Sequence, residues 1–365
     1  MEKTQAVQLI QDLSNANGVS GFEEEVVALV KKATSEFSEA RVDGIKNLYL
    51  SRPQNTGKRP VLQFDAHSDE VGMMIQAVKE NGLMAFLTVG GWVPANLTAQ
   101  KVRIRNRDGR YVPGIVTSKP PHFMTAEERK KAIELKDLFI DVGATSAEEV
   151  TEVYKIDIGA PIVPDVTCVY DEETDKFLGK AFDCRIGVAC MVDVLSELAE
   201  DDLPFDLVST LSAQEEVGER GTKVAAKQVQ ADLSIVFEGC PADDTEEPYK
   251  VQSGMGRGPM LRNFDISMIT NPEWQAYAGE IAKKFDIPMQ TSVRSGGGTN
   301  GAIINLVKGA PTIVVGIPVR YAHTPHCFID YKDYQAAKQL VLEIVRSLDE
   351  ATFDRCANPL GGLFK

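Results

Sequence analysis

The segment at residues 205–221 reads FDLVSTLSAQEEVGERG, and its two halves differ in character. The first half is an apolar run typical of a buried strand, and the second places two adjacent glutamates, Glu215 and Glu216, before glycine. A buried carboxylate costs free energy unless it is paired or binds a metal ion. Because neighbouring side chains on a strand point to opposite faces, we expect the two glutamates to have different roles.

The same pattern, an apolar run that turns polar at its end, recurs along the chain. It is found in FDAHSDE (64–70), IVFEG (235–239) and GIPVRYAHTPH (316–326), with helical patterns such as 186–200 between the runs. This alternation predicts an α/β fold with a largely parallel central sheet and helices on both faces. Near the N-terminus, the spacing of Ser20 and Glu23 is that of a capping box, which predicts the start of a helix.

The middle of the chain breaks this alternation. Residues 73–164 contain short strand-like pieces separated by turns, including a hairpin turn predicted at residues 107–109. The sequence therefore predicts an inserted β-rich domain, and a main domain formed by residues 1–72 and 165–365. The stretch GLMAFLTVGGWVPANL (82–97) is rich in apolar side chains, and an apolar patch on so small a domain predicts an interface.

Composition excludes several classes of protein. The 365 residues are 43% hydrophobic and 25% charged, with a net charge of −14, which argues against a nucleic-acid partner. No signal peptide and no apolar run of about 20 residues is present, so we expect no membrane partner. The six cysteines form no CxxC pair, which favours free thiols and a cytoplasmic location.

Side chains that can bind metal lie at the predicted strand ends. A site with two metal ions needs a bridging oxygen ligand, and Asp183 can supply it if each ion also takes one histidine and one further carboxylate. Glu215 is then left over as a general base for a metal-bound water. The candidate ligands are His67, Asp183, Glu216, Glu238 and His323.

Each candidate also has an ordinary structural explanation. Asp183 suits the N-cap of the following helix, the glutamate pair suits a solvated turn, and a histidine at a strand end is often only exposed. However, three of the four histidines lie at the predicted ends of the first and last of these strands. This clustering favours the metal site.

Taken together, the motifs resemble those of the glutamyl/tetrahedral aminopeptidase family, which are dinuclear metallopeptidases of the zinc-exopeptidase clan. The matching pieces run from near the N-terminus to past residue 320: GVSGFEEEV, FDAHSDEVG, GWVPANL, VPGIVTSKPPH, AFDCRIGV, SAQEEVGERG, SGGGTNGAI and PVRYAHTP. HSDEVG followed by QEEVGERG is the most specific part of the resemblance.

The resemblance implies a function and a cofactor. It implies an aminopeptidase acting on short peptides, with two divalent ions (zinc, with cobalt or manganese as alternatives) on the five ligands above. It implies Glu215 as the general acid/base and Asp69 as the residue that orients His67. It further implies that residues 73–164 form a β-barrel or PDZ-like dimerisation domain, and that dimers assemble into a tetrahedral dodecamer.

Several features depart from the family pattern or leave alternatives open. Cys184 follows Asp183 where an acidic or amide residue is usual, Glu238 often corresponds to aspartate, and Asn300 stands in GGTNG instead of GGTDA. His122 and His326 are interpreted as structural. Arg257, Arg294 and Arg320 are candidates for selecting an acidic N-terminal residue.

Other activities compete with the aminopeptidase hypothesis. The alternatives are a deacylase or carboxypeptidase of the same clan and a non-catalytic scaffold that retains the fold. A metal-independent endoglucanase is disfavoured. Hydrolysis of a sugar bond needs only two carboxylates, so the histidines would have no role in it.

Overall fold

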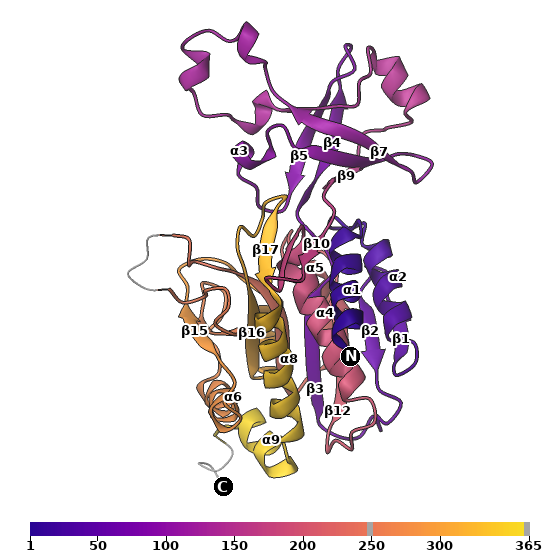
Figure 1. The fold of residues 1–365 in the computed structure, drawn as a ribbon. Helices are drawn as coiled ribbons and strands as arrows, with labels where there is room; N and C mark the ends of the chain where they lie inside the picture. Colours follow the sequence, from indigo (N-terminus) through magenta and orange to yellow (C-terminus); the bar gives the residue numbers. More distant parts are fainter. Residues whose placement is uncertain (247–250, 361–365) are drawn as a thin grey trace.

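An eight-stranded sheet lies at the centre of the protein, in a computed structural model that describes residues 1–246 and 251–360 (Figure 1). In spatial order its strands are β1 (Glu39–Val42), β2 (Leu48–Ser51), β12 (Asp206–Ser212), β3 (Val61–His67), β13 (Leu233–Pro241), β16 (Thr312–Val319), β14 (Met260–Phe264) and β15 (Gln290–Val293). The four central strands β12, β3, β13 and β16 run parallel, as expected for an α/β fold.

The edges of the sheet differ from the prediction. Strand β2 pairs antiparallel with both β1 and β12, and β14 pairs antiparallel with β16. The expectation of a largely parallel sheet therefore holds only for the centre, and the sheet as a whole is mixed. A short connection such as the one between β1 and β2 can join only antiparallel neighbours, because a parallel pair needs a crossover of a dozen or more residues.

Helices cover both faces of the sheet. One face carries α1 (Lys3–Asn15), α4 (Phe182–Glu197), α6 (Pro272–Lys284) and α8 (Tyr331–Arg346), with α2 (Glu24–Ala33) and α9 (Glu350–Ala357) at its margins. The other face carries α5 (Arg220–Val229) and α7 (Asn300–Lys308). Strand β13 serves both layers because its side chains alternate: Ile235 and Phe237 pack toward α4, and Val236 toward α7.

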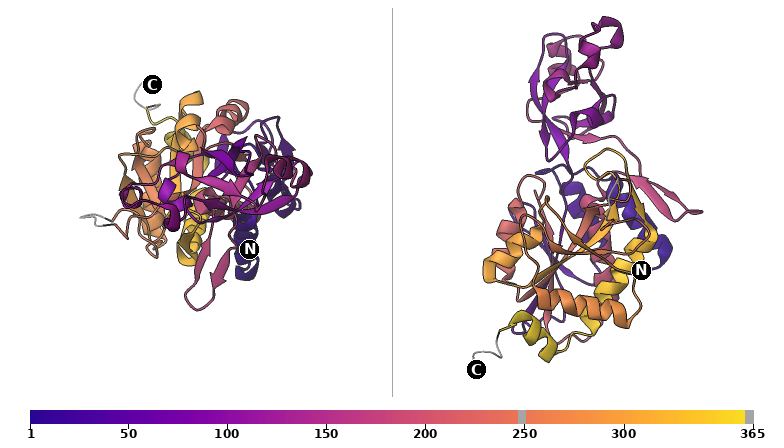
Figure 2. Two further views of the ribbon diagram at one scale, coloured as in Figure 1. Left: turned by 90° about the horizontal axis from the view of Figure 1, so that it is seen from above. Right: turned by 90° about the vertical axis from the view of Figure 1, so that its left-hand side faces the viewer.

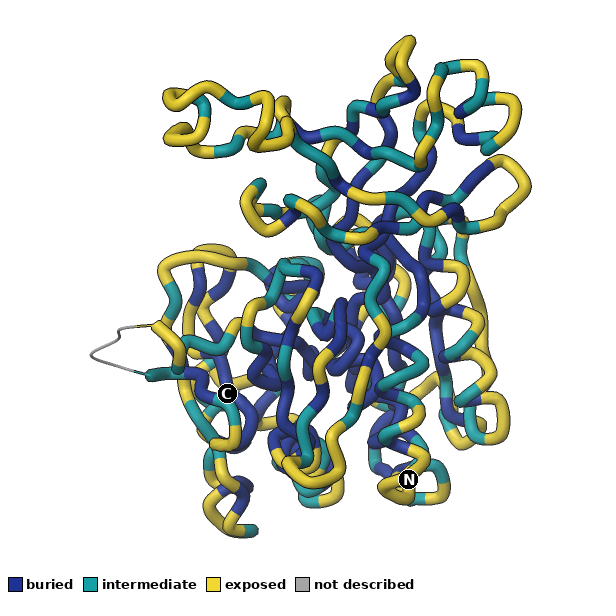
Figure 3. The backbone as a smooth tube through the Cα atoms, turned by 45° about the horizontal axis from the view of Figure 1, so that its top comes forward, coloured by how far each residue is buried: buried dark blue, intermediate teal, exposed yellow. Residues whose placement is uncertain are grey.

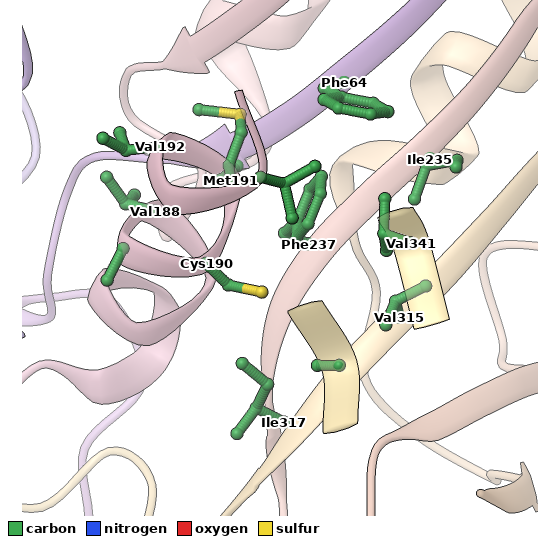
Figure 4. Close-up of a cluster of buried hydrophobic side chains, with 14 of the residues drawn as sticks. Phe64, Val188, Cys190, Met191, Val192, Ile235, Phe237, Val315, Ile317 and Val341 are labelled. Carbon is green, nitrogen blue, oxygen red and sulfur yellow. The ribbon is translucent and has the colours of Figure 1, made fainter. Parts of the chain in front are cut away.

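The larger core lies between α4, α8 and the sheet (Figure 4). Phe64 of β3 and Phe237 of β13 meet edge to face, with ring centroids 5.2 Å apart. Helix α4 is buried along almost its whole length, which explains why its sequence is apolar on all sides. This packing fixes the start of α4 against the ends of β3 and β13.

A closed six-stranded β-barrel stands apart from the sheet, at the top of Figure 1 and of the right-hand view of Figure 2. Its strands are β4 (Gly72–Val78), β5 (Met84–Val89), β8 (Phe139–Asp141), β7 (Tyr111–Thr117), β6 (Lys101–Arg105) and β9 (Pro161–Pro164). Strands β6 and β7 form an antiparallel hairpin, which confirms the turn predicted at residues 107–109.

Short helical turns decorate the barrel, whose outer loops are largely exposed (Figure 3). They are α3 (Pro94–Leu97), η1 (Pro121–Phe123), η2 (Glu128–Lys130), η3 (Leu135–Asp137) and η4 (Glu149–Val153). A small third sheet, β10 (Val169–Asp171), β11 (Lys176–Gly179) and β17 (Cys327–Asp330), packs against α1 and α8, and its β10–β11 hairpin projects from the side of the α/β core in the right-hand view of Figure 2. Within residues 1–246 and 251–360, no helix combines the length and apolarity that crossing a membrane requires.

Candidate metal centre

The carboxyl ends of the central strands meet at the edge of the sheet that faces the barrel (Figure 1). His67 ends β3, the glutamate pair follows β12, Glu238 lies near the end of β13, and His323 follows β16. A cavity of about 540 Å³ opens there and is lined by all five predicted ligands and Glu215. The structure thus brings together residues that are separated by up to 256 positions, from residue 67 to residue 323.

Asp183 lies between the two histidines. Its Oδ1 is 3.0 Å from Nε2 of His67, and its Oδ2 is 3.3 Å from Nε2 of His323. The backbone of Asp183 is non-helical, but within the described residues its carboxylate accepts no hydrogen bond from a helix N–H, so it does not act as the helix cap that its position also suggested. Its carboxylate is free to serve two partners at once, one with each oxygen.

Each histidine has a second carboxylate beside it. Oε1 of Glu238 lies 3.5 Å from Nε2 of His67, and Oε1 of Glu216 lies 3.3 Å from Nε2 of His323. The five candidates therefore form two groups that share Asp183, and each group offers one nitrogen and two carboxylates.

Glu215 is not needed for either of these groups, although with His67 and Glu216 it forms a further set of side chains close enough together to hold an ion. Its Oε2 lies 4.0 Å from Nε2 of His67, and its side chain is only 13% exposed, so the pair at 215–216 is not a solvated turn. Burial, together with the charges of Glu238, Glu216 and Asp69, raises the pKa of Glu215 well above its usual value.

Asp69 lies behind His67 and is fully buried. Its Oδ1 is 3.3 Å from Nδ1 of His67, on the ring nitrogen that faces away from Asp183. The same carboxylate accepts hydrogen bonds from the backbone N–H groups of Glu215, at 2.9 Å, and Glu216, at 3.1 Å. Asp69 therefore fixes both the histidine and the glutamate turn relative to each other.

The capping box predicted at Ser20 and Glu23 is wrong. Helix α2 begins at Glu24, and neither side chain caps it. Instead, Ser20 Oγ donates a hydrogen bond of 2.6 Å to Asp69, and Oε1 of Glu23 accepts one of 3.2 Å from the backbone N–H of Gln214. Both side chains therefore hold residues of the site in place, because the loop before α2 packs against the ends of β3 and β12.

The donor set fits a divalent cation. Within the described residues, Oε1 of Glu216 is buried and forms no hydrogen bond, although Nε2 of His323 lies 3.3 Å away. Burial lowers the pKa of His323, but Asp183 and Glu216 outweigh this and raise it to about 11. Burial alone would raise the pKa of Asp183, but the interactions with the two histidines outweigh burial and lower it. So many buried carboxylates around two imidazoles require positive charge, which bound metal supplies.

Two residues at the centre were not assigned a role from the sequence. The thiol of Cys184 lies with His67 and Glu238 in one cluster, and it donates to the carbonyl of Phe237 at 3.1 Å. Gly91, from the barrel turn after β5, approaches the ring of His323. The sequence argument considered only polar residues that follow apolar strands, and it therefore could not predict either contact.

Other sequence candidates lie outside the ligand groups. Arg294 lines the cavity and pairs with Asp243 at 3.0 Å, whereas Arg320 pairs with Asp244. His326 lies 3.3 Å from Gln100 Oε1, and His122 is exposed. Asn300 is buried below the cavity wall formed by residues 295–299.

Comparison with known proteins identifies relatives over nearly the whole chain. The family model described as M42 glutamyl aminopeptidase matches residues 47–340. A putative aminopeptidase, FrvX, of Escherichia coli K12 is 32% identical over 94% of this chain and 95% of its own.

Two solved structures resemble the protein closely. The crystal structure of a TET aminopeptidase from the marine sediment archaeon Thaumarchaeota archaeon SCGC AB-539-E09 has a TM-score of 0.91 and 35% identity, and the match covers 96% of this chain and 99% of that one. An aminopeptidase of the archaeon Desulfurococcus kamchatkensis has a TM-score of 0.90 and 30% identity, with coverage of 97% and 98%.

Proposed function

The chain belongs to the M42 glutamyl aminopeptidase family, and from this premise we propose that it removes N-terminal residues from short peptides with two divalent metal ions. The reaction class, peptide-bond hydrolysis by an aminopeptidase, is that of the family and its relatives. For this chain we propose, in addition, that two ions bind and which residues hold them.

The position of Asp183 carries the proposal of two ions. One of its oxygens faces His67 and the other faces His323, and each histidine has its own further carboxylate. His67 and Glu238 would hold one ion, His323 and Glu216 the other, with Asp183 between them. Nitrogen and carboxylate donors of this kind favour zinc and also accept cobalt and manganese.

Glu215 is the proposed proton-transfer group. When bound, the metal ions supply Lewis-acid polarisation of the scissile carbonyl. Glu215 is held beside both ligand groups through its backbone N–H, which donates to Asp69. In this role it would take a proton from the attacking water and return it to the leaving amine. Asp69 orients His67 for its ligand role.

We also propose that the protein forms homo-oligomers from dimers, up to a tetrahedral dodecamer. The barrel exposes several large apolar side chains, which a monomer would leave in water: Leu87, Val93, Ile115 and Phe123. An assembly built through the barrel would restrict access to short, unfolded peptides.

A substrate and metal panel tests the function. Aminoacyl-p-nitroanilides and short peptides should be cleaved, EDTA should abolish cleavage, and zinc or cobalt should restore it. Peptides with an acetylated N-terminus should resist hydrolysis, which separates an aminopeptidase from a deacylase of the same clan. Activity that survives complete removal of metal would contradict the proposal.

The role of Glu215 has its own test. Glu215→Gln should lower turnover at least ~100-fold, because the proton-transfer group is lost. Elemental analysis should still find about two ions per chain, since the proposed ligands are intact. Glu219→Gln is the matched control, because Glu219 lines the same cavity and is paired only loosely with Lys223, at 3.7 Å. Loss of both ions in Glu215→Gln would show that Glu215 is a ligand.

A further inference from the structure

A turn of the barrel reaches the proposed metal centre from outside the α/β core. The turn is formed by Gly90 and Gly91, directly after β5. A Cβ atom placed on Gly91 would lie 3.1 Å from Nδ1 of His323 and 3.6 Å from its Cε1. A Cβ atom placed on Gly90 would lie 3.3 Å from Cβ of Glu216. The barrel backbone is therefore packed against both side chains that are proposed to hold the second ion.

The two glycines are required for different reasons. Gly90 has a φ of +83°, a left-handed conformation that favours glycine whatever surrounds it. Gly91 does not adopt such a conformation, so its backbone would accept alanine. Among residues 1–246 and 251–360, the only obstacle to a side chain at Gly91 is the His323 ring, which lies closer than a carbon atom normally approaches. Glycine at position 91 is therefore explained by its close packing against the ring of His323.

His323 needs such a support. It lies in the loop between β16 and β17, its side chain is 39% exposed, and its own φ is +61°. Asp183 and Glu216 contact the ring only through Nε2. On the opposite side of the ring, at Nδ1, the barrel turn is the neighbour. His67 differs, since it is buried and has Asp69 behind it.

A second contact ties the same loop to the barrel. Nε2 of His326 lies 3.3 Å from Oε1 of Gln100, which directly precedes β6. The loop that carries His323 is thus held by the barrel at two points three residues apart. A displacement of the barrel would therefore move this loop.

We infer that Gly91 is a positioning residue that fixes the His323 ring for metal binding, so that the inserted barrel is a structural part of the second metal site. The inference rests on the proposed two-metal function. It predicts that a methyl group at Gly91 selectively weakens one ion, because support of a ligand ring is typically worth about 10–100-fold in affinity.

Metal titration of the full-length protein tests this inference. Zinc binding to the metal-stripped chain is followed by calorimetry, and the bound ions are counted after dialysis. Gly91→Ala should weaken one of the two binding events by about 10–100-fold and leave the other unchanged. Gly44→Ala is the matched control, because no atom of the described part of the chain lies within 4 Å of its added Cβ and its φ is not left-handed. If each ion binds to Gly91→Ala with the same affinity as to the wild type, the inference is overturned.

A double-mutant cycle separates ring displacement from general damage. In a His323→Ala background the added methyl group has no ring to displace. Gly91→Ala should then change neither the remaining ion's affinity nor the melting temperature. A destabilisation of the same size in both backgrounds would show that the methyl group acts elsewhere and would overturn the inference. If the wild-type chain itself binds fewer than two ions, the proposed function fails instead.

Discussion

The side-chain amide of Asn300 donates a hydrogen bond of 2.7 Å to Oδ2 of Asp65, and both residues are buried. The other oxygen of Asp65 accepts from the hydroxyls of Thr210 and Ser212. Burial raises the pKa of Asp65 to about 6, although these hydrogen bonds oppose the shift. Asn300 begins α7, so the bond anchors the glycine-rich wall of the cavity, residues 295–299, to the central sheet.

This contact predicts a pH-dependent cost for Asn300→Asp. Two buried carboxylates would face each other, and the folded chain would keep a proton that the unfolded chain releases near pH ~4. The folded state then binds more protons, so its stability falls as pH rises above that value. Urea denaturation should show a loss of about 1–3 kcal/mol at pH 7.5 and a smaller one at pH 5.

A charge swap provides the control for this prediction. Asp65→Asn combined with Asn300→Asp restores one amide and one carboxylate, and the hydroxyls of Thr210 and Ser212 can rotate to suit either. The swapped protein should regain most of the lost stability. If the single variant is as stable as the wild type at both pH values, the bond does not anchor the loop.

Much of the fold and the clustering of the candidate residues could be predicted from the strand ends. Parallel strands place their carboxyl ends at one edge, so polar residues that follow several apolar runs must converge there. That argument reaches His67, Glu216, Glu238 and His323 without knowledge of their contacts. The direction of the edge strands was not predicted, because an apolar run has the same pattern in either direction.

Supports of the site that come from other segments could not be predicted. Ser20 has the spacing of a helix cap, and the same spacing serves equally well for donating to Asp69. Gly91 looks like any turn glycine, and only tertiary packing brings it to His323. The roles of the ligands themselves stay predictions that metal analysis must test.

Asp183 and Asp69 should differ in their effect on metal content. Asp183→Ala removes the carboxylate shared by both ligand groups, so both ions should be lost on dialysis. Asp69→Asn leaves every proposed ligand in place and should weaken mainly the ion at His67, by about 10–100-fold. Elemental analysis after dialysis against graded zinc concentrations measures both effects. Equal and small losses in the two variants would show that their roles are misassigned.

Metal binding should release protons. Without metal, the neighbouring carboxylates raise the pKa of His323 to about 11 against the opposing effect of burial, and the pKa of His67 is also raised. At neutral pH an incoming ion must therefore displace a proton from each ring, and apparent affinity should rise about tenfold per pH unit for each proton released. Calorimetric titration with zinc in two buffers of different ionisation enthalpy measures this release. A binding heat that is independent of the buffer would contradict the protonated state of the metal-free centre.

The barrel should carry the subunit interface. Leu87 and Ile115 lie on strands β5 and β7 with 51% and 46% of their surface exposed, an arrangement that an oligomer would cover. Replacing either by aspartate would place an unpaired charge in that contact and should shift the protein to smaller species, as measured by light scattering at micromolar concentration. Ile269→Asp is the control, because Ile269 is 73% exposed but belongs to the α/β core. A wild-type monomer would exclude assembly altogether, and dissociation caused by Ile269→Asp alone would place the interface on the α/β core instead of the barrel.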